Sequence, residues 1–105
     1  MISWPSAIKS AQTYDGLIEF SDFFPTLAAI AGQDIVSDGE SFLPLLEGNQ
    51  HQLRETVFVH YDPRWGKRVN EYRNQFVQTT EYKLYQDGKL FHLPSDPLEE
   101  HPISE

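Results

Sequence analysis

The feature that most constrains the fold is the stretch of residues 20–32, FSDFFPTLAAIAG. Its apolar residues recur at the spacing of one face of an α-helix, which favours a packed amphipathic helix. Pro25 is compatible with a helix only in the first turn, where its missing N–H is not needed. Gly32 supplies the positive φ at which helices commonly end. We therefore predict a helix over residues 25–31.

The polar residues just before this helix are expected to cap it. Ser21 or Asp22 can accept a hydrogen bond from an unpaired backbone N–H of the first turn, with residues 22–24 forming a tight turn into the helix. Asp22 could instead be a catalytic carboxylate, but its place at a helix start favours the cap. By itself the stretch predicts packing and indicates no chemistry.

The composition excludes several classes of function. The 105 residues suffice for one domain or part of one, with a modest core that seven Phe and five Tyr should make aromatic. Sixteen acidic residues against eight Lys and Arg give a net charge of −8, which argues against nucleic acid as a partner. Cysteine is absent, so a disulfide, a thiolate metal site and a cysteine nucleophile are excluded. No apolar run approaches the ~18 residues of a membrane helix, and residues 1–5 do not resemble a signal peptide.

The rest of the N-terminal half alternates short apolar runs with turn signals. Residues 1–5 and 17–20 are predicted to be short strands. Residues 41–47 are predicted to be a short helix, with Ser41 as its cap and Gly48 as its stop.

The C-terminal half is predicted to be an antiparallel sheet. Its strand candidates are rich in β-branched and aromatic residues and cover residues 56–61, 72–79, 82–85 and 89–93. Asp87 and Gly88, between the last two candidates, indicate a hairpin. Residues 94–105 contain three prolines and are expected to form an irregular, partly frayed tail. The predicted fold class is therefore α+β: a helix, then a small sheet of three or four antiparallel strands ending in a hairpin.

Three blocks of the chain resemble the C-terminal region of the formylglycine-dependent sulfatases. Residues 22–32 are similar to the signature D-[LI]-F-P-T-L-…-A-G, and residues 38–48 to D-G-x-S-[LF]-L-P-L-L-x-G. Residues 73–99 are similar to R-x-x-V-R-T-x-x-Y-K-L…E-L-Y-D-L-x-x-D-P-x-E, except that Gln78 stands where relatives often have Arg. Residues 3–5 match the end of a further stretch, P-L-[IV]-[VI]-x-W-P.

The resemblance implies a fragment of the alkaline-phosphatase-like sulfatase fold. Residues 1–48 would be the end of the catalytic domain, with 1–5 as the remnant of an inner strand, and residues 49–105 the C-terminal antiparallel subdomain. The implied partners are the missing N-terminal catalytic half and a sulfated carbohydrate or aryl sulfate. Exposed strand edges at 1–5 or 17–20 would allow self-association. Members of the family are usually periplasmic or secreted.

The chemistry that the family implies lies outside this chain. Sulfatases hydrolyse sulfate esters with a formylglycine hydrate and a bound calcium ion. Their C-x-P-S-R motif, calcium ligands and catalytic His and Lys lie upstream of the position that Met1 matches. We therefore assign no catalytic residue and no metal ligand here, and we expect the 105 residues alone to be inactive. The four His are scattered, without the spacing of a metal site.

One loop candidate reverses the acidic character of the chain. Arg64, Lys67, Arg68 and Arg73 fall within ten positions, beside Trp65 and downstream of His60. Arg matches oxyanions with a planar fork of donors, and Trp offers a flat face to a sugar ring. The predicted substrate-binding residues of a sulfatase pocket are therefore His60, Arg64, Trp65, Lys67 and Arg68. The alternative is a solvated loop whose cations pair with Asp62 and Glu71.

Two other functions stay open at this point. The chain could be a stand-alone, non-enzymatic module that holds an anionic glycan through the Trp65 loop. It could also be a fragment of a related phosphatase or phosphonate-type hydrolase. Upstream sequence would separate these readings, because C-x-P-S-R indicates a sulfatase, whereas a Thr or Ser nucleophile with metal-binding Asp and His indicates a phosphatase.

Overall fold

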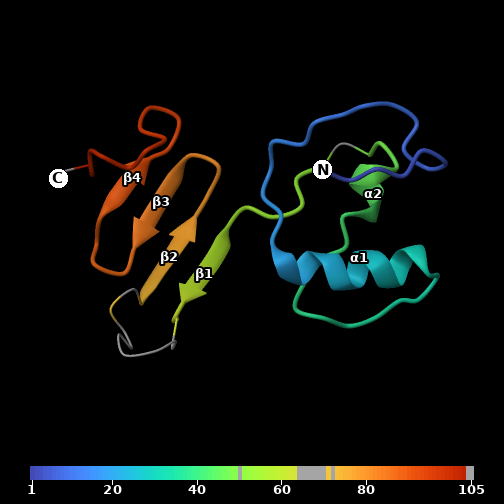
Figure 1. Cartoon of the computed structure of the whole chain (residues 1–105), viewed down its shortest axis with the longest axis horizontal. Helices are drawn as coiled ribbons and strands as arrows, with labels where there is room; N and C mark the ends of the chain where they lie inside the picture. The colour runs from blue at the N-terminus through green and yellow to red at the C-terminus, as the bar shows by residue number, and fades with distance from the viewer. Residues whose placement is uncertain (50, 64–70, 72, 104–105) are drawn as a thin grey trace. The chain divides into compact units, whose positions relative to one another are not determined.

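The computed structural model describes residues 1–49, 51–63, 71 and 73–103. The chain divides into two compact units, Met1–Arg54 and Glu55–Glu105. The first holds short helices, and the second holds an antiparallel sheet, which is the α+β combination that the sequence predicts (Figure 1). The assignment of residues 1–48 to the end of a catalytic domain stays a prediction.

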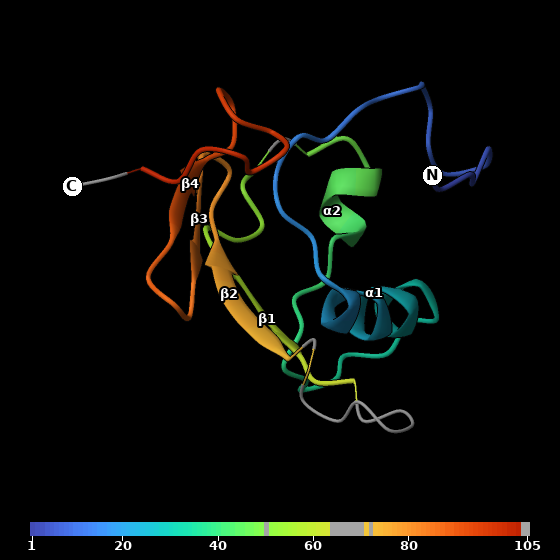
Figure 2. The same cartoon turned by 60° about the vertical axis from the view of Figure 1, so that its left-hand side comes forward.

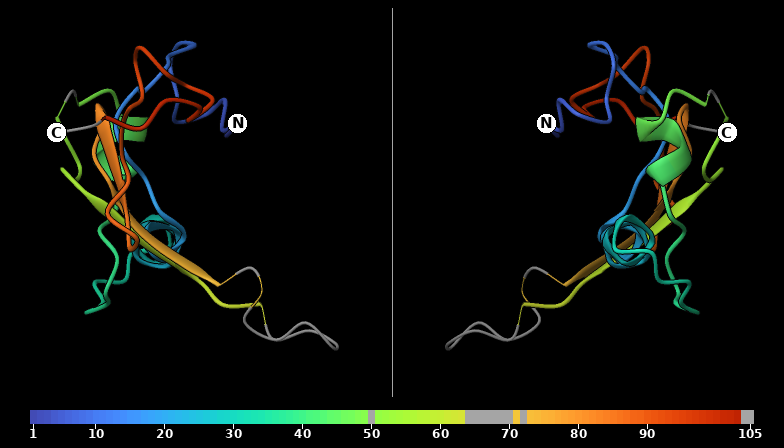
Figure 3. Two further views of the ribbon diagram at one scale, coloured as in Figure 1. Left: turned by 90° about the vertical axis from the view of Figure 1, so that its left-hand side faces the viewer. Right: turned by 90° about the vertical axis from the view of Figure 1, so that its right-hand side faces the viewer.

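The central helix of the first unit forms where the sequence predicts it. A 3₁₀ turn, η1 (Phe20–Asp22), leads into helix α1 (Phe23–Ile30), and Figure 3 looks along the axis of α1. The helix begins two residues earlier than predicted, at Phe23. Pro25 still lies in the first turn, where its missing N–H is not needed. Gly32, with φ of 74°, ends the helix, and its N–H donates to the Ala29 carbonyl at 3.0 Å.

The short helix of the first unit is α2 (Leu43–Leu46), within the predicted 41–47. The N-cap of this helix is Phe42 and no side chain caps it, so the predicted capping by Ser41 is wrong, although the Ser41 hydroxyl accepts the Leu43 N–H at 3.3 Å. Gly48 ends the helix with φ of 94°, as predicted. The buried core of this unit is small and consists of Phe42, Leu45 and Leu53, with Tyr14 and Leu46 packed against it. The ring of Phe23 on α1 meets Phe42 edge to face, with centroids 5.2 Å apart.

The two strands predicted near the N-terminus are wrong. Residues 1–5 and 17–19 have no regular structure, and Phe20 belongs to the 3₁₀ turn. A strand requires a neighbour for its hydrogen bonds, and in the described part of the chain neither segment pairs with one. Self-association through strand edges at these two positions therefore has no basis in the structure.

The second unit is one sheet of four antiparallel strands in the order β1-β2-β3-β4 (Figure 2). The strands match the four predicted runs and are β1 (Val57–Tyr61), β2 (Asn74–Gln78), β3 (Tyr82–Tyr85) and β4 (Leu90–His92). The predicted hairpin joins β3 and β4, with Gly88 at φ of 89° and its N–H 3.0 Å from the Tyr85 carbonyl. In the first hairpin, Tyr61 lies opposite Asn74, so residues 62–73 connect the ends of β1 and β2.

The C-terminal segment is held on one face of this sheet. Lys83 Nζ lies 2.7 Å from Glu99 Oε1, and the Tyr85 hydroxyl donates to the other oxygen of the same carboxylate. The Ile103 N–H donates to the Leu90 carbonyl at 2.7 Å. The tail is irregular, as predicted, but over residues 94–103 the expectation of fraying is wrong, because Lys83 and Tyr85 provide a charged and hydrogen-bonded anchor.

Candidate functional site

The structure describes one of the five predicted substrate-binding residues. His60 lies on β1 and is exposed. Arg64, Trp65, Lys67 and Arg68 lie outside the described residues. In the sequence those four residues belong to the β1–β2 connection. The candidate site is therefore described from the residues at the two ends of that connection.

At the ends of β1 and β2, four polar side chains form a cluster that we call the hairpin-end cluster: His60, Asp62, Arg73 and Gln75. The His60 and Gln75 positions are paired in the sheet, and His60 Nδ1 lies 2.6 Å from Gln75 Nε2. The Asp62 carboxylate lies between the two basic side chains. Its Oδ2 atom is 3.9 Å from His60 Nε2 and 3.8 Å from Arg73 Nε.

The exposure of the cluster leaves its basic groups accessible to an anion. The side chain of Asp62 is only 11% exposed, whereas His60 is 38% and Arg73 47% exposed. His60 Nδ1 lies within hydrogen-bond distance of the Gln75 amide nitrogen, and the other ring nitrogen, Nε2, faces the Asp62 carboxylate. The cluster therefore holds two basic side chains, those of His60 and Arg73, next to the carboxylate of Asp62.

Of the four members of this cluster, only His60 is among the residues predicted to bind substrate. Arg73 belongs to the predicted basic run, Asp62 enters only as an expected partner of its cations, and Gln75 carries no local signal. The available signal was strand pairing: a hairpin between the predicted strands 56–61 and 72–79 brings residues near 60 and 75 together. For Arg73, the pairing with Asp62 is the one expected from the solvated-loop alternative.

A second polar group, buried in the first unit, is centred on Asp22. Its side chain is fully buried. Its oxygens accept the N–H of Glu19 at 2.9 Å and the N–H of Glu40 at 2.8 Å, and they bind the Arg54 guanidinium through Nε (3.1 Å) and Nη2. Asp22 stands at the start of α1, but its side chain accepts no N–H from that helix, so the predicted capping role is wrong. The Asp22 oxygens are already occupied by the Arg54 guanidinium and by the N–H groups of Glu19 and Glu40, and the charged Arg54 is a stronger partner than an N–H of the helix.

The charge state of Asp22 follows from these contacts. Burial alone would raise the pKa of Asp22, but the N–H groups of Glu19 and Glu40 and the Arg54 guanidinium outweigh it, so the pKa lies below its usual value. Asp22 is therefore held as a carboxylate. It is a structural anion, not a proton donor for catalysis.

Thr26 and Gly39 belong to the same buried polar group, which we call the polar lock and define by Asp22, Thr26, Gly39 and Arg54. The buried Thr26 hydroxyl donates to the Asp22 carbonyl at 2.6 Å and accepts the Phe42 N–H at 3.0 Å. Gly39 passes so close to η1 that a Cβ there would lie 1.9 Å from the Ser21 carbonyl oxygen. The Asp22, Thr26 and Gly39 positions of the two N-terminal sequence blocks thus join η1, the 39–42 segment and Arg54.

The described residues do not fit the calcium ion that the family resemblance implies. The chain has no cysteine and therefore lacks the cysteine of the C-x-P-S-R motif that is converted to formylglycine. The buried carboxylate of Asp22 already accepts hydrogen bonds from two backbone N–H groups and from the Arg54 guanidinium. These contacts leave no lone pair on its oxygens for a cation. Among the described residues, no three His, Asp or Glu side chains gather as a metal site.

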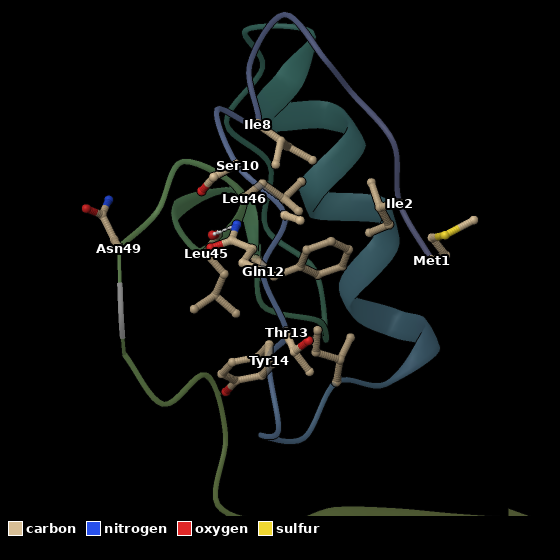
Figure 4. A pocket seen from close by; sticks show the side chains of 13 residues that line it. Met1, Ile2, Ile8, Ser10, Gln12, Thr13, Tyr14, Leu45, Leu46 and Asn49 are labelled. Atoms are coloured by element: carbon tan, nitrogen blue, oxygen red, sulfur yellow. Dashed lines mark hydrogen bonds between the residues drawn. The ribbon is translucent and has the colours of Figure 1, made fainter.

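A cavity of about 490 Å³ lies in the first unit, between residues 1–18 and α2 (Figure 4). Its lining is mostly apolar and includes Ile8, Tyr14 and Leu45, and none of the side chains that line it is charged. The Gln12 amide that faces it donates to the Leu45 carbonyl at 3.0 Å. This lining does not suit a sulfated sugar.

No helix in the described part of the chain is long and apolar enough to cross a membrane.

The fold and the sequence blocks define the class as the C-terminal region of a sulfatase. The chain belongs to the N-sulphoglucosamine sulphohydrolase C-terminal family, whose model matches residues 1–105. The resemblance to the formylglycine-dependent sulfatases, which rests on three short blocks of the sequence, is thereby confirmed over the whole chain.

Curated sulfatases show the same relationship in sequence. The chain is 40% identical over 57 residues to an ulvan-active sulfatase of Formosa agariphila, covering 52% of the chain and 11% of that protein. It is 34% identical over 65 residues to human steryl-sulfatase, covering 58% of the chain and 11% of that protein. It is 28% identical over 114 residues to an N-acetylglucosamine-6-O-sulfatase of Bacteroides thetaiotaomicron, covering 98% of the chain and 20% of that protein.

Solved structures agree with this assignment. BT4656, solved in complex with its substrate D-glucosamine-2-N,6-O-disulfate, is similar with a TM-score of 0.64 and 27% identity, over 78% of this chain and 19% of that chain. BT1596, a 2-O GAG sulfatase, has a TM-score of 0.61 and 25% identity, over 80% of this chain and 19% of that chain. The chain thus spans between about a tenth and a fifth of the length of these relatives.

Proposed function

We propose that this chain is the C-terminal part of a sulfatase acting on a sulfated carbohydrate, and that the hairpin-end cluster forms part of the wall of its substrate pocket. The observation that carries the proposal is the pair of exposed basic side chains, His60 and Arg73, held by Asp62 where the β1–β2 connection begins and ends. The relatives named for N-acetylglucosamine 6-O-sulfate and glucosamine disulfate support a sulfated amino sugar as the substrate.

The cluster suits recognition better than catalysis. Arg73 Nε lies 3.8 Å from the Asp62 carboxylate, and the Arg73 side chain is 47% exposed, so its guanidinium can face a sulfate or carboxylate of the sugar. His60 Nε2 lies 3.9 Å from the same Asp62 oxygen. The calcium ion and the formylglycine nucleophile belong, in this proposal, to an N-terminal catalytic part that acts as the partner of this chain. Arg64, Trp65, Lys67 and Arg68 stay predicted contacts of the same pocket.

Replacing Arg73 by Ala is expected to weaken substrate binding without disabling chemistry. In a fusion of this chain to the catalytic part of BT4656, Arg73→Ala should raise KM for D-glucosamine-2-N,6-O-disulfate about tenfold, with kcat changed less than about threefold. His60→Ala should act in the same direction with a smaller effect. Steady-state sulfate release measures both constants.

Lys89→Ala is the matched control, because Lys89 is an exposed cation that pairs with Asp87 in the β3–β4 turn. It should leave KM unchanged. Equal kinetics for Arg73→Ala, Lys89→Ala and the unaltered fusion would refute the pocket-wall assignment while leaving the family membership intact.

A further inference from the structure

The His60 ring is surrounded by polar groups of the hairpin-end cluster. It lies on β1, which is the first strand in the sheet order and pairs with β2. Among the described residues, the polar and charged groups around the ring are those of Asp62, Arg73 and Gln75. Two of these groups are charged, and their charges have opposite signs.

The Asp62 carboxylate attracts both basic side chains without a close hydrogen bond to either measured atom. Its Oδ2 atom lies 3.9 Å from His60 Nε2 and 3.8 Å from Arg73 Nε, and both distances are longer than a hydrogen bond. Because the His60 and Arg73 side chains are also exposed, their nitrogen atoms can donate to an anion from solution.

The protonation of His60 decides the charge of this cluster. While the imidazole is neutral, the charges of Asp62 and Arg73 cancel, and when the imidazole is protonated the described cluster is positive. Histidine changes its charge between about pH 5 and pH 8, whereas a sulfate ester stays ionised over that range. Since the chain as a whole carries a net charge of −8, this local positive charge matters to an anionic ligand.

Gln75 lets the ring change its charge without losing a partner. His60 Nδ1 lies 2.6 Å from the Gln75 amide nitrogen. A glutamine amide carries a donor nitrogen and an acceptor oxygen on the same carbon, so a half-turn of the amide suits either the neutral or the protonated ring. Protonation therefore changes the charge of the cluster and keeps this contact.

We propose that His60 is a specificity-determining residue that binds the substrate anion more tightly when its imidazole is protonated. The inference rests on the proposed function and adds the regulation of that site. The anion is a sulfate group of the sugar, whose oxygens accept hydrogen bonds from the imidazolium and from the Arg73 guanidinium. His60 acts on binding, so the effect of pH through this residue lies in KM and not in kcat.

Kinetics of the fusion to the catalytic part of BT4656 test the proposal, with D-glucosamine-2-N,6-O-disulfate as substrate at about pH 5.5 and about pH 8. His60→Gln is neutral at both pH values, and His60→Lys is charged at both. The matched control is His51→Gln, which removes an exposed histidine of the first unit. Titrating groups of the catalytic part affect every fusion alike, so the KM ratio of variant to unaltered fusion reports on His60.

For His60→Gln this KM ratio should be about five to ten at pH 5.5 and within about twofold of one at pH 8. His60→Lys should match the unaltered fusion at pH 5.5 and have the lower KM at pH 8, because it keeps its charge. His51→Gln should give a ratio of one at both pH values. The kcat ratios should not depend on pH, and the melting temperatures should be unchanged, because His60 is exposed.

Nuclear magnetic resonance of the 105-residue chain gives the same comparison without turnover. The disulfate is titrated into the chain at the two pH values, and the His60 ring resonances report its binding. The affinity should be higher at pH 5.5, and His60→Gln should abolish the difference. This measurement decides the question if the fusions turn over too slowly for kinetics.

A His60→Gln ratio that is the same at both pH values, or a disulfate affinity of the chain that does not depend on pH, would overturn the inference. Arg73→Ala separates this failure from that of the proposed function. If Arg73→Ala raises KM while the His60→Gln ratio is independent of pH, the pocket wall stands and the role of the His60 charge is refuted. If Arg73→Ala leaves KM unchanged, the proposed function itself is refuted.

Discussion

Replacing Arg54 by Ala is expected to lower the free energy of unfolding by about 3–5 kcal/mol, because it leaves the fully buried Asp22 carboxylate without its counter-ion. The Glu19 carboxylate, 2.9 Å from Arg54 Nη1, would lose the same partner. Urea denaturation followed by circular dichroism measures the loss. Arg54→Lys keeps the charge but not the two-pronged contact, and it should lose less. Lys89→Ala, which removes an exposed cation, should cause no measurable change.

The same contacts set the acid sensitivity of the fold. Because the pKa of Asp22 is lowered on folding, its stabilising contribution is complete above the unfolded value of about 4 and is lost as the pH falls through the lower folded value. In Arg54→Ala, burial acts with fewer opposing contacts, so the loss should begin at a higher pH than in the unaltered chain. An Arg54→Ala variant as stable as the unaltered chain at pH 7 would contradict the buried-pair account.

Replacing Gly39 by Ala is the second substitution expected to have a large effect. The added Cβ would lie 1.9 Å from the Ser21 carbonyl oxygen and 2.7 Å from the Asp22 amide nitrogen, and both are backbone atoms of η1. Separating the two segments would stretch the Glu40 N–H contact to Asp22, so we expect a loss of about 2–3 kcal/mol, as for severe overpacking. Thermal unfolding gives the measurement.

Val36→Ala is the control for this prediction, because Val36 is fully exposed in the same loop and its methyl groups pack on nothing. It should leave the melting temperature unchanged. If Gly39→Ala unfolds at the same temperature as Val36→Ala, the close approach of the two backbone segments does not contribute to stability.

Local sequence signals predicted the elements that depend on local chemistry. The 3.6-residue spacing together with Pro25 and Gly32 located α1 to within two residues. The Asp-Gly pair at 87–88 located the β3–β4 hairpin, because Gly88 provides the positive φ of the turn. Both features rest on backbone conformations that single residues impose.

Features that depend on distant partners could not be predicted in this way. Asp22 looked like a helix cap because its decisive partner, Arg54, is 32 residues away in sequence. The tail looked free to fray because the motif residues Lys83 and Glu99 reveal their pairing only once the sheet exists. Residues 17–20 looked like a strand because a short apolar run does not show whether a neighbouring strand is present.

The candidate site shows the same division. A local excess of basic residues indicated the β1–β2 connection, and His60 lies on β1 just before that connection begins. The arrangement around Asp62 depends on strand register, which brought in Gln75 from the facing strand and Arg73 from the other end of the connection. The substrate-contact roles of the candidates stay predictions that the kinetic variants test.

We propose that this chain contributes to the substrate pocket of a sulfatase and that the catalytic groups lie outside these 105 residues. Sulfate release from 4-nitrophenyl sulfate is measured for the purified 105-residue chain supplied with calcium and then for its fusion to the sulfatase catalytic part. We predict release by the fusion and none above the buffer rate by the chain alone. Turnover by the chain alone would show that the 105 residues carry catalytic groups of their own.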